Sequence, residues 1–413
     1  MKKLAIISSY NESCGNASYT HVIKKALSAE FDVEVIPLDL FFIQKTGALF
    51  KKQADKHFRQ IADRLQYFDY VNIQFEAGLY GTSPADIFKH VEWLIDASKN
   101  VIVTMHRVDP LSVTLPRALG AWISSGSKRE FDRLMNRRQY EQLYYKIIKK
   151  VKKASESKNA WVLVHTNRDK RIIKQMYDFE NCIDHPLSFL EPEERASVHQ
   201  MVDKGDFLKK HGFDPGSKIV GVFGYIAAYK GVETAVAAME YLPKEYQLAI
   251  FGSQHPQTIR EFVDIDPFLS KVLNGVKRTE ARGKTNSEWK NRVRFMGNLS
   301  DPDFIEALRL CDAVVLPYME VGQSMSGVLV LALEAGARMI VSNNLAFFEA
   351  QKYFGEVFET FDIGNALELA QKVQFGQERY EEQREIAFKS YNIGTLSTLM
   401  SSTYGLRAAT ERK

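Results

Sequence analysis

Hydrophobic positions along the chain fall into two alternating patterns. Short apolar runs bounded by turn residues are followed by longer segments in which apolar residues recur every three or four positions. The first pattern is typical of buried parallel strands, and the second of helices that cover a sheet. In the first half, strands are predicted at Lys3–Ser9, Asp32–Leu38, Tyr70–Phe75, Val101–His106 and Trp161–His165 (the last of this half), and helices at Tyr19–Phe31, Phe50–Tyr67 and Pro84–Ser98.

A polar stretch at Glu191–Lys210 interrupts the alternation and is predicted to be a connector. The alternation then restarts, which predicts two doubly wound, Rossmann-like α/β domains with parallel sheets and a cleft between them. In this half, strands are predicted at Lys218–Phe223, Gln247–Phe251, Arg292–Phe295, Ala313–Leu316 and Met339–Val341, and helices at Val232–Tyr241, Asp303–Cys311, Gly327–Gly336 and Ala366–Val373. The predicted domains are 1–190 and 191–385, followed by a C-terminal crossover segment 386–413; a closing helix at about 378–404 is expected to return to the first domain.

Composition narrows the class of protein. A length of 413 residues favours two domains, and 45% hydrophobic with 26% charged residues is ordinary for a globular enzyme;. No apolar stretch approaches the ~20 residues of a membrane-spanning helix, and the run after Lys3 is too short for a signal peptide. Three scattered cysteines indicate neither disulfides nor zinc;. We therefore expect a cytoplasmic protein, and a net charge of only +4 gives no reason to expect nucleic acid as a partner;.

Basic residues are concentrated in one segment, 128–158, where they alternate with tyrosines and aliphatic residues. This pattern predicts a long helix with an apolar stripe and a basic face. Two interpretations stay open. The basic face is either the solvated side of a helix packed on its own domain, or a docking surface for an anionic membrane or a phosphate-bearing acceptor.

Candidate ligand contacts in the first domain follow the predicted strands, because open α/β sheets bind ligands beyond the carboxyl ends of their strands. Gly15 and Asn16 precede the first helix, where backbone N–H groups can approach a phosphate;. His106 ends the fourth predicted strand, and Gln74 and Glu76 end the third. We expect these side chains to line the same ligand-binding edge.

Two further candidates lie in the second domain. The strand that restarts the alternation leads through Gly224 and Tyr225 to Lys230, just before a helix. A lysine there opposes the helix dipole unless an anion lies between the two. Further along, a polar loop containing Glu320 leads into an apolar helix with Glu334 embedded in it. A carboxylate in such surroundings needs hydrogen-bond donors, and sugar hydroxyls are the predicted ones.

Three short sequences imitate other sites. Gly283-Lys284-Thr285 resembles the end of a P-loop, but its first glycine would fall at Arg278;. Asp264-Ile265-Asp266 and Asp301-Pro302-Asp303 resemble metal-binding Asp-x-Asp motifs, yet both stand in polar helix starts and not after an apolar strand. We therefore expect neither a bound metal nor another cofactor.

Taken together, these stretches resemble glycosyltransferase family 4, whose members are retaining enzymes of the GT-B fold, and the resemblance spans nearly the whole chain. The order and spacing of the motifs make it specific. In the first domain it rests on Cys14–Thr20, Ile73–Glu76, Val103–His106 and the stretch Ile183–Pro186 around His185, and in the second on Gly224–Gly231 and Gln323–Gly336, which resemble a Gly-Arg-x4-Lys-Gly loop and the Gln-Ser-x-Ser-Gly-Val-Leu form of the donor loop.

The resemblance implies a role for each matching position. A donor diphosphate would be bound by Lys230, and the donor ribose by Glu334. Ser326, with the amides of Gly327 and Val328, would contact the donor sugar or phosphate. Gly15 would face the diphosphate from the first domain, and His106 would contact the transferred sugar. Two positions depart from the family pattern. Tyr225 stands where the family has an arginine, and Ser326 stands where the first glutamate of a Glu-x7-Glu pair belongs, with Glu320 out of register.

The expected function is therefore retaining transfer of a hexose from a nucleoside-diphosphate sugar to a glycan or glycolipid, in surface polysaccharide synthesis and without a metal. The departing phosphate oxygen would itself take the acceptor proton. Two alternatives stay open: a GT-B nucleotide-sugar 2-epimerase, and a non-catalytic GT-B partner subunit, which the missing arginine and glutamate favour. The two departures leave the donor sugar open.

Overall fold

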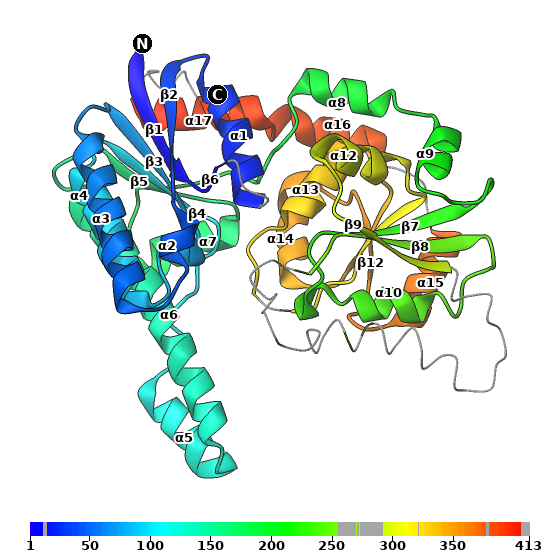
Figure 1. Ribbon diagram of the computed structural model, residues 1–413, viewed down its shortest axis with the longest axis horizontal. Helices are drawn as coiled ribbons and strands as arrows, with labels where there is room; N and C mark the ends of the chain where they lie inside the picture. Colours follow the sequence, from blue (N-terminus) through cyan, green and yellow to red (C-terminus); the bar gives the residue numbers. More distant parts are fainter. Residues whose placement is uncertain are drawn as a thin grey trace. The chain divides into compact units, whose positions relative to one another are not determined.

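The computed structural model describes residues 1–10, 15–254, 270, 272, 292–320, 322–376 and 380–405. The chain divides into two compact units: Met1–Leu187 with the C-terminal segment from Ile393, and Ser188–Asn392. Each unit is built on one parallel sheet with helices packed against it (Figure 1). The predicted pair of Rossmann-like α/β domains is confirmed.

The first unit follows the predicted alternation closely. Its strands are β1 (Lys2–Ser8), β2 (Phe31–Pro37), β3 (Tyr70–Phe75), β4 (Val101–Met105), β5 (Ala160–Val164) and β6 (Cys182–Asp184). Its helices are α1 (Gly15–Leu27), α2 (Leu40–Ile43), α3 (Ala48–Leu65), α4 (Pro84–Ala97), α5 (Leu115–Ser125), α6 (Lys128–Ala154), α7 (Asn167–Tyr177) and α17 (Ile393–Thr403), with a 3₁₀ turn η1 (Ala77–Leu79) after β3. The short strand β6 was not predicted, so Trp161–His165 does not contain the last strand of this half.

The sheet of the first unit has the strand order β2-β1-β3-β4-β5-β6, and every pair is parallel. The chain moves to one side for β2 and to the other side from β3 onward. The order therefore reverses between β1 and β3, which is where open α/β sheets form a ligand crevice at their carboxyl ends. Strands β3 and β4 are buried throughout, as continuous apolar runs in a parallel sheet should be;.

The second unit has its own six strands among the described residues: β7 (Lys218–Phe223), β8 (Tyr246–Phe251), β9 (Val293–Gly297), β10 (Ala313–Leu316), β11 (Met339–Ser342) and β12 (Glu359–Phe361). Its helices are α8 (Pro192–His199), α9 (Lys204–Lys210), α10 (Val232–Ala238), α12 (Asp301–Leu310), α13 (Gly327–Glu334), α14 (Leu345–Phe354), α15 (Ala366–Phe375) and α16 (Glu381–Ser390), with a 3₁₀ turn η2 (Ala228–Lys230). The order β12-β11-β10-β7-β8-β9 is parallel throughout and reverses between β7 and β10.

The predicted connector 191–210 contains two helices, α8 and α9, and belongs to the second unit. Few apolar residues were visible there, but Glu191 and Glu194 form a capping box around Pro192, and Asp203 caps α9;. Phe207 and Leu208 supply its buried side. Local capping therefore made helices where the hydrophobic period was weak.

The closing helix is divided in two. Helix α16 belongs to the second unit and α17 to the first. The Ser397 hydroxyl donates to the Ala26 carbonyl at 3.3 Å, and the Tyr404 hydroxyl donates to the Val71 carbonyl at 2.9 Å. Within the first unit α17 thus packs on α1, and the return to this unit begins at Ile393, later than the predicted position 386.

Two of the imitating sequences, 264–266 and 283–285, lie outside the described residues. The third opens α12, where the Ser300 hydroxyl accepts from the Asp303 amide and Lys210 pairs with Asp303 at 2.7 Å. Among the described helices, none is both long enough and apolar enough to cross a bilayer.

Candidate functional site

The carboxyl end of β7 is held against the end of β10, at the point where the strand order of the second unit reverses. Gly231 has φ +58°, and a Cβ at this position would lie 1.9 Å from the Pro317 carbonyl oxygen, so only glycine fits;. The Met319 amide donates to the Tyr229 carbonyl at 2.7 Å. These contacts fix the loop that carries Lys230 against the strand end that carries Tyr318.

Lys230 is a buried cation at this junction, with 7% of its surface exposed. Its ammonium donates to the Tyr318 hydroxyl and lies 4.1 Å from the centre of that ring. Burial lowers the pKa of Lys230. Among the described residues no carboxylate pairs with it, and an unpaired buried charge is costly;. The position therefore suits an anionic ligand.

The start of α13 lies beside this lysine. A Cβ at Gly224, where φ is +96°, would have the Lys230 Nζ at 3.5 Å and Val328 Cγ2 at 3.6 Å, so the missing side chain leaves the lysine uncovered on this side. Ser326 caps α13 by accepting from the Leu329 amide, and its hydroxyl lies 3.5 Å from that of Tyr318. Five predicted donor-site residues are thus brought together: Gly224, Lys230, Ser326, Gly327 and Val328.

The loop before α13 also contains a buried hydroxyl that has no hydrogen-bond partner in the described part of the chain, that of Ser324. Such groups are normally paired, with protein or with a ligand. Tyr225, where the resemblance expects an arginine, is half-buried and brings no charge. The anion would therefore meet one lysine together with neutral donors.

Glu334 is buried and already has donors from the protein. Its carboxylate accepts from the Ser188 hydroxyl at 2.6 Å, from the Phe189 amide at 2.9 Å and from the Leu190 amide at 3.1 Å. Burial raises its pKa to about 7, and these three donors act in the opposite direction. The carboxylate therefore does not need ribose hydroxyls to satisfy it, and its role toward the donor ribose stays a prediction.

Glu320 is exposed and also serves its own loop. Its two oxygens accept from the amides of Gly322 and Leu345, at 2.9 and 2.8 Å, and so tie the loop to the first turn of α14. Sequence reasoning grouped it with the acceptor-side residues. In the structure its carboxylate stabilises the loop after β10.

In the first unit, the predicted residues stand at the ends of β1, β3 and β4. Gly15 opens α1, and its missing side chain would meet open space. The Thr20 hydroxyl lies 2.7 Å from both the Asn16 carbonyl and the Ser8 hydroxyl, which fixes the first turn of α1 to the end of β1. Glycine is therefore not required there by packing, and open backbone N–H groups are what it offers.

His106 ends a chain of buried amide hydrogen bonds that runs across β3 and β4. Asn72 Nδ2 donates to the Ile102 carbonyl at 3.3 Å and to the Thr104 hydroxyl at 3.0 Å. Gln74 Nε2 donates to Asn72 Oδ1 at 2.5 Å, and Gln74 Oε1 lies 2.8 Å from His106 Nε2. We call Thr104, Asn72, Gln74 and His106 the amide relay.

The relay determines the tautomer of His106. A main-chain carbonyl such as that of Ile102 can only accept, so Asn72 must present its N–H group there and its oxygen to Gln74. Gln74 then presents its oxygen to the imidazole, and His106 must carry its proton on Nε2, which leaves Nδ1 as an acceptor. Burial lowers the pKa of His106 to about 4, so the ring is neutral at pH 7.

Glu76 lies next to this relay at the end of β3. Burial raises the pKa of its carboxyl group, while the Arg107 guanidinium opposes that shift and Asp109 adds to it. Arg107 pairs with Asp109 at 2.7 Å. The carboxyl edge of the first sheet is therefore polar, and burial disfavours the charged form of Glu76 there.

His185 lies in the core of the first unit with 4% of its surface exposed. Its Nδ1 donates to the Pro186 carbonyl at 2.7 Å, and its Nε2 accepts from the Thr395 hydroxyl at 2.9 Å. Its carbonyl accepts from Nδ1 of the equally buried His165 at 3.0 Å. His185 thus holds β6 to α17, and its place on the acceptor side stays a prediction.

A comparison with protein families finds a match in the second unit. Residues 203–388, most of that unit, match the family model of glycosyl transferases group 1.

Solved structures extend this likeness to the fold of the whole chain. HepE of Anabaena in complex with UDP has 13% identical residues and a TM-score of 0.64, over 98% of this chain and all of that one. Sucrose-phosphate synthase of Thermosynechococcus elongatus has 15% identity and a TM-score of 0.62, over 98% of this chain and 99% of that one. A UDP-forming trehalose-phosphate synthase of Burkholderia xenovorans has 9% identity and a TM-score of 0.65, over 99% and 100%.

The predicted GT-B fold is thereby confirmed, since these similarities are at the level of fold. No curated protein sequence matches the chain significantly.

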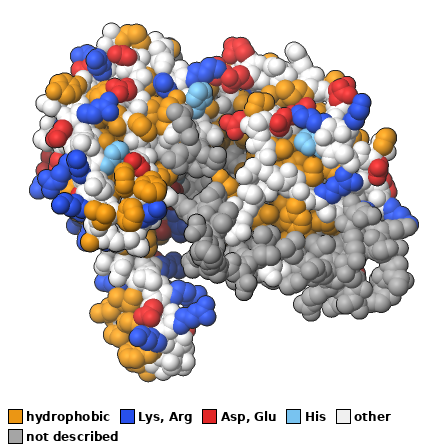
Figure 2. Space-filling view, in the orientation of Figure 1, with side chains coloured by type: hydrophobic (Ala, Val, Ile, Leu, Met, Phe, Trp, Pro, Cys, Tyr) orange, Lys and Arg blue, Asp and Glu red, His pale blue; other side chains and the backbone are white. Residues whose placement is uncertain are grey.

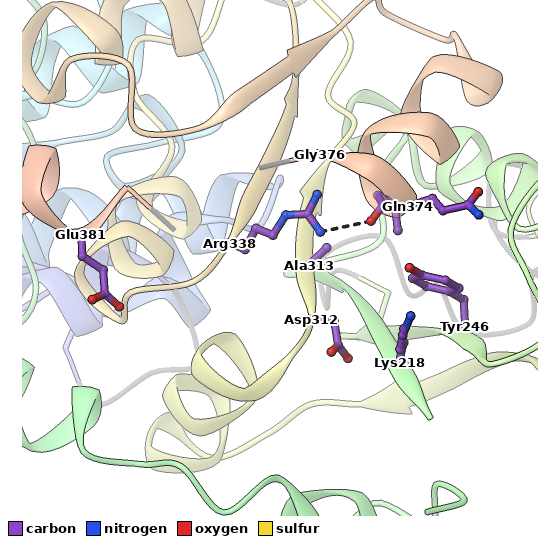
Figure 3. Close-up of a pocket in the computed structure, with 9 residues that line it drawn as sticks. Lys218, Tyr246, Asp312, Ala313, Arg338, Gln374, Gly376 and Glu381 are labelled. Atoms are coloured by element: carbon purple, nitrogen blue, oxygen red, sulfur yellow. Dashed lines mark hydrogen bonds between the residues drawn. The ribbon is translucent and has the colours of Figure 1, made fainter. Parts of the chain in front are cut away.

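One cavity of the second unit lies away from Lys230. It has a volume of about 540 Å³ and lies at the amino ends of β7, β8, β10 and β11 (Figure 3). Two of its charged groups already have partners: Asp312 accepts from Lys204 and from the Ile219 amide, and Arg338 donates to the Val373 carbonyl. The opposite sheet edge, which carries Lys230, is therefore the candidate site.

Sequence reasoning missed three members of the two sites. Tyr318 lies under Lys230, and its only signal was its place directly after the strand Ala313–Leu316. Asn72 and Thr104 are polar residues inside predicted apolar strands, a pattern that itself asks for buried partners;.

Proposed function

We propose that the protein transfers a hexosyl group from a nucleoside-diphosphate sugar to a hydroxyl of a glycan or lipid-linked acceptor, as a retaining enzyme that needs no metal. The single observation that carries the proposal is Lys230, a buried ammonium with no acidic partner in the described structure, inside the region that matches the family model of glycosyl transferases group 1. The similar HepE structures contain UDP and UDP-glucose, which makes a UDP-hexose the first donor to try.

Leaving-group stabilisation is the chemical task of the second unit. As the bond between the anomeric carbon and the diphosphate breaks, negative charge develops on the leaving oxygen. The Lys230 ammonium and the amides at the start of α13 are preorganised to bind that charge in a site of low water content. The Tyr318 hydroxyl holds the ammonium in place and adds no charge.

The first unit would bind neutral hydroxyls. Its amide relay leaves His106 Nδ1 as an acceptor, which matches a sugar hydroxyl and not a phosphate. In the retaining reaction the acceptor oxygen attacks the face that the diphosphate leaves. The acceptor proton passes to the departing phosphate oxygen, so no side-chain base is required.

The test is a donor panel with UDP-, GDP- and ADP-hexoses, in which nucleotide release and the anomeric configuration of the sugar product are measured by NMR. We expect slow hydrolysis with retained configuration, accelerated by a suitable glycan. Formation of an epimerised nucleotide sugar would establish a 2-epimerase in place of a transferase. Tight donor binding without any turnover would establish a non-catalytic partner.

A chelation experiment tests the metal-free part separately. Transfer should persist in excess EDTA, because cationic and amide groups of the protein carry the phosphate charge. Loss of transfer with EDTA, restored by manganese or magnesium, would refute this part and leave the transferase assignment standing.

A further inference from the structure

Helices α5 and α6 form a hairpin whose outer half stands apart from the sheet of the first unit (Figure 1). Gly126, with φ +62°, ends α5, and the next residue, Ser127, caps α6. The connection is thus as short as two antiparallel helices allow. We call residues 111–140 the hairpin.

The hairpin is held in one orientation at its base. The buried Glu141 carboxylate accepts from the Ser112 amide and the Val113 amide, each at 2.8 Å, and from Arg137 at 2.9 Å. Arg138 donates to the Val113 carbonyl at 2.9 Å. Burial of Glu141 opposes its ionisation, but these donors outweigh burial and lower its pKa. The hairpin is therefore a fixed projection at neutral pH.

One face of α5 is apolar and uncovered. Its large side chains stand at helical spacing, so they form a single stripe. Trp122 is 47% exposed and Ile123 81% exposed, and Ala118 is the one buried residue of the helix. The stripe consists of Leu115, Leu119, Trp122 and Ile123.

Basic residues lie on the same hairpin as this stripe. The hairpin contains six Lys or Arg and two Asp or Glu, a net charge of +4 that equals the net charge of the entire chain. Arg117, Lys128 and Arg129 are exposed, and no acidic partner contacts them in the described residues. Figure 2 shows hydrophobic and basic side chains next to one another on this projection.

The inner half of α6 is different, although it is equally basic in sequence. Lys150 pairs with Glu92 at 2.9 Å and with Asp96 at 2.7 Å, and Lys152 pairs with Asp178 at 2.9 Å. Its apolar residues, such as Ile147 and Val151, are buried against the first unit. For this half, the structure favours the interpretation as a helix packed on its own domain.

We propose that the hairpin docks the protein on an anionic phospholipid surface, with the α5 stripe entering the interface and Arg117, Lys128 and Arg129 at the headgroups. An apolar face with tryptophan, bordered by basic residues, is the composition that interfacial helices share. Charge decides against a second copy of the chain as the occupant, because two hairpins of net charge +4 would repel each other. This proposal does not depend on the donor site.

The test is binding of the full-length protein to vesicles of phosphatidylcholine mixed with phosphatidylglycerol, measured by co-sedimentation over a range of salt. The variant Arg117→Gln/Lys128→Gln/Arg129→Gln should bind about a hundredfold more weakly at low salt, since each basic residue near the surface contributes about fivefold. Binding of the natural protein should fall steeply with salt, and vesicles of phosphatidylcholine alone should retain little of it.

A second variant, Trp122→Ser/Ile123→Ser, separates insertion from electrostatic attraction. It should retain salt-sensitive attraction but bind the same vesicles more weakly at every salt concentration. The matched control is Lys146→Gln/Lys149→Gln/Lys153→Gln, which removes the same charge from the inner half of α6. It should bind nearly as tightly as the natural protein.

Three outcomes would overturn the proposal. One is equal weakening by the control triple, which would make the effect one of overall charge. Another is unchanged vesicle binding of both hairpin variants. The third is a stable dimer in sedimentation that Trp122→Ser/Ile123→Ser converts to a monomer without a change in vesicle binding, which would assign the stripe to a second copy. Circular dichroism and melting temperature of each variant check that the hairpin has not unfolded.

Discussion

The carboxyl edges of the two sheets handle polar groups in opposite ways. In the first unit each polar side chain of the amide relay is paired with a protein group, and His106 is neutral. In the second unit a buried ammonium faces the Tyr318 hydroxyl, and no carboxylate of the described chain neutralises it. Both edges lie where the strand order reverses.

This difference indicates a division of labour. A neutral, preorganised acceptor such as His106 Nδ1 recognises hydroxyls, whereas an unpaired buried cation recognises an anion. Topology alone places a ligand crevice on each unit. Only the charge state of each edge says which part of a sugar nucleotide or acceptor it suits.

The substitution Lys230→Ala is the strongest test of the charge difference between the two sheet edges. Turnover should fall by roughly 10²–10³, the scale for removing one preorganised charge stabiliser. The empty protein should be about as stable as before or more so, because an unpaired buried charge costs free energy. Steady-state kinetics and thermal melting measure the two effects. Lys218→Ala is the control, at the other end of β7, and it should leave turnover unchanged.

A Lys230→Ala protein with normal turnover and a greatly lowered melting temperature would make this lysine structural. The contrast between the two edges would then lose its basis.

The substitution Glu334→Ala tests whether this carboxylate stabilises the second unit or binds the nucleotide. Removing the carboxylate leaves two main-chain amides and a hydroxyl without their acceptor, which should cost about 2–3 kcal/mol. Nucleotide affinity should change little if the carboxylate serves only these protein donors, since both of its oxygens already accept from them. Chemical denaturation and calorimetric titration with UDP test the pair of effects. A large loss of UDP affinity without loss of stability would support the ribose role.

A fall in pH should lower the stability of the first unit more than that of the second. His106 and His185 have pKa values of about 4, and His165 is shifted in the same direction, all through burial. The unfolded chain, with histidine pKa near 6.5, therefore binds more protons, and stability is lost as pH falls from about 6.5 toward 4, by up to about 2 kcal/mol per histidine at pH 5.

Glu334 changes stability with pH in the opposite direction. Its pKa is raised to about 7, so between about pH 7 and the ordinary glutamate pKa the folded state binds a proton that the unfolded chain does not, and acid stabilises the fold at this residue;. It partly offsets the acid-sensitive histidines His199 and His211 of the second unit. Hydrogen exchange at pH 7 and pH 5, after correction for the intrinsic rate, should show greater loss of protection in β3 and β4 than in β10 and β11. Equal loss in both sheets would contradict the assignment.

The smallest expected effect concerns the relay. Gln74→Glu places a carboxylate beside His106 Nε2 and should raise the pKa of His106, so that kcat/KM acquires an inflection near neutral pH and drops about tenfold below it. Thr104→Val is the matched control, because Asn72 can still donate to the Ile102 carbonyl in this variant. The kcat/KM of Thr104→Val should therefore show no inflection near neutral pH. A flat profile for Gln74→Glu, with the variant folded, would make the relay purely structural.

Site residues differed in how well the sequence predicted them. Lys230, Gly224 and Ser326 were found because turn glycines and a strand–loop–helix pattern place them at a strand end, and the structure assembles them. Glu334 was also correctly identified as a carboxylate in need of donors. Its donors come from Ser188–Leu190, far away in sequence, so the pattern could not tell protein donors from a ligand.

The sequence by itself determined the alternation of strands and helices, the two parallel α/β units and the position of most candidate residues, because hydrophobic period and turn chemistry are local. Tertiary structure alone decided the rest. It paired Lys150 and Lys152 of the inner half of α6 with Glu92, Asp96 and Asp178, and it left Arg117, Lys128 and Arg129 of the hairpin without an acidic partner among the described residues. It also set the tautomer of His106 through Ile102 and placed Tyr318 under Lys230. Burial, pairing and charge state depend on which distant segments meet, and no local pattern records that.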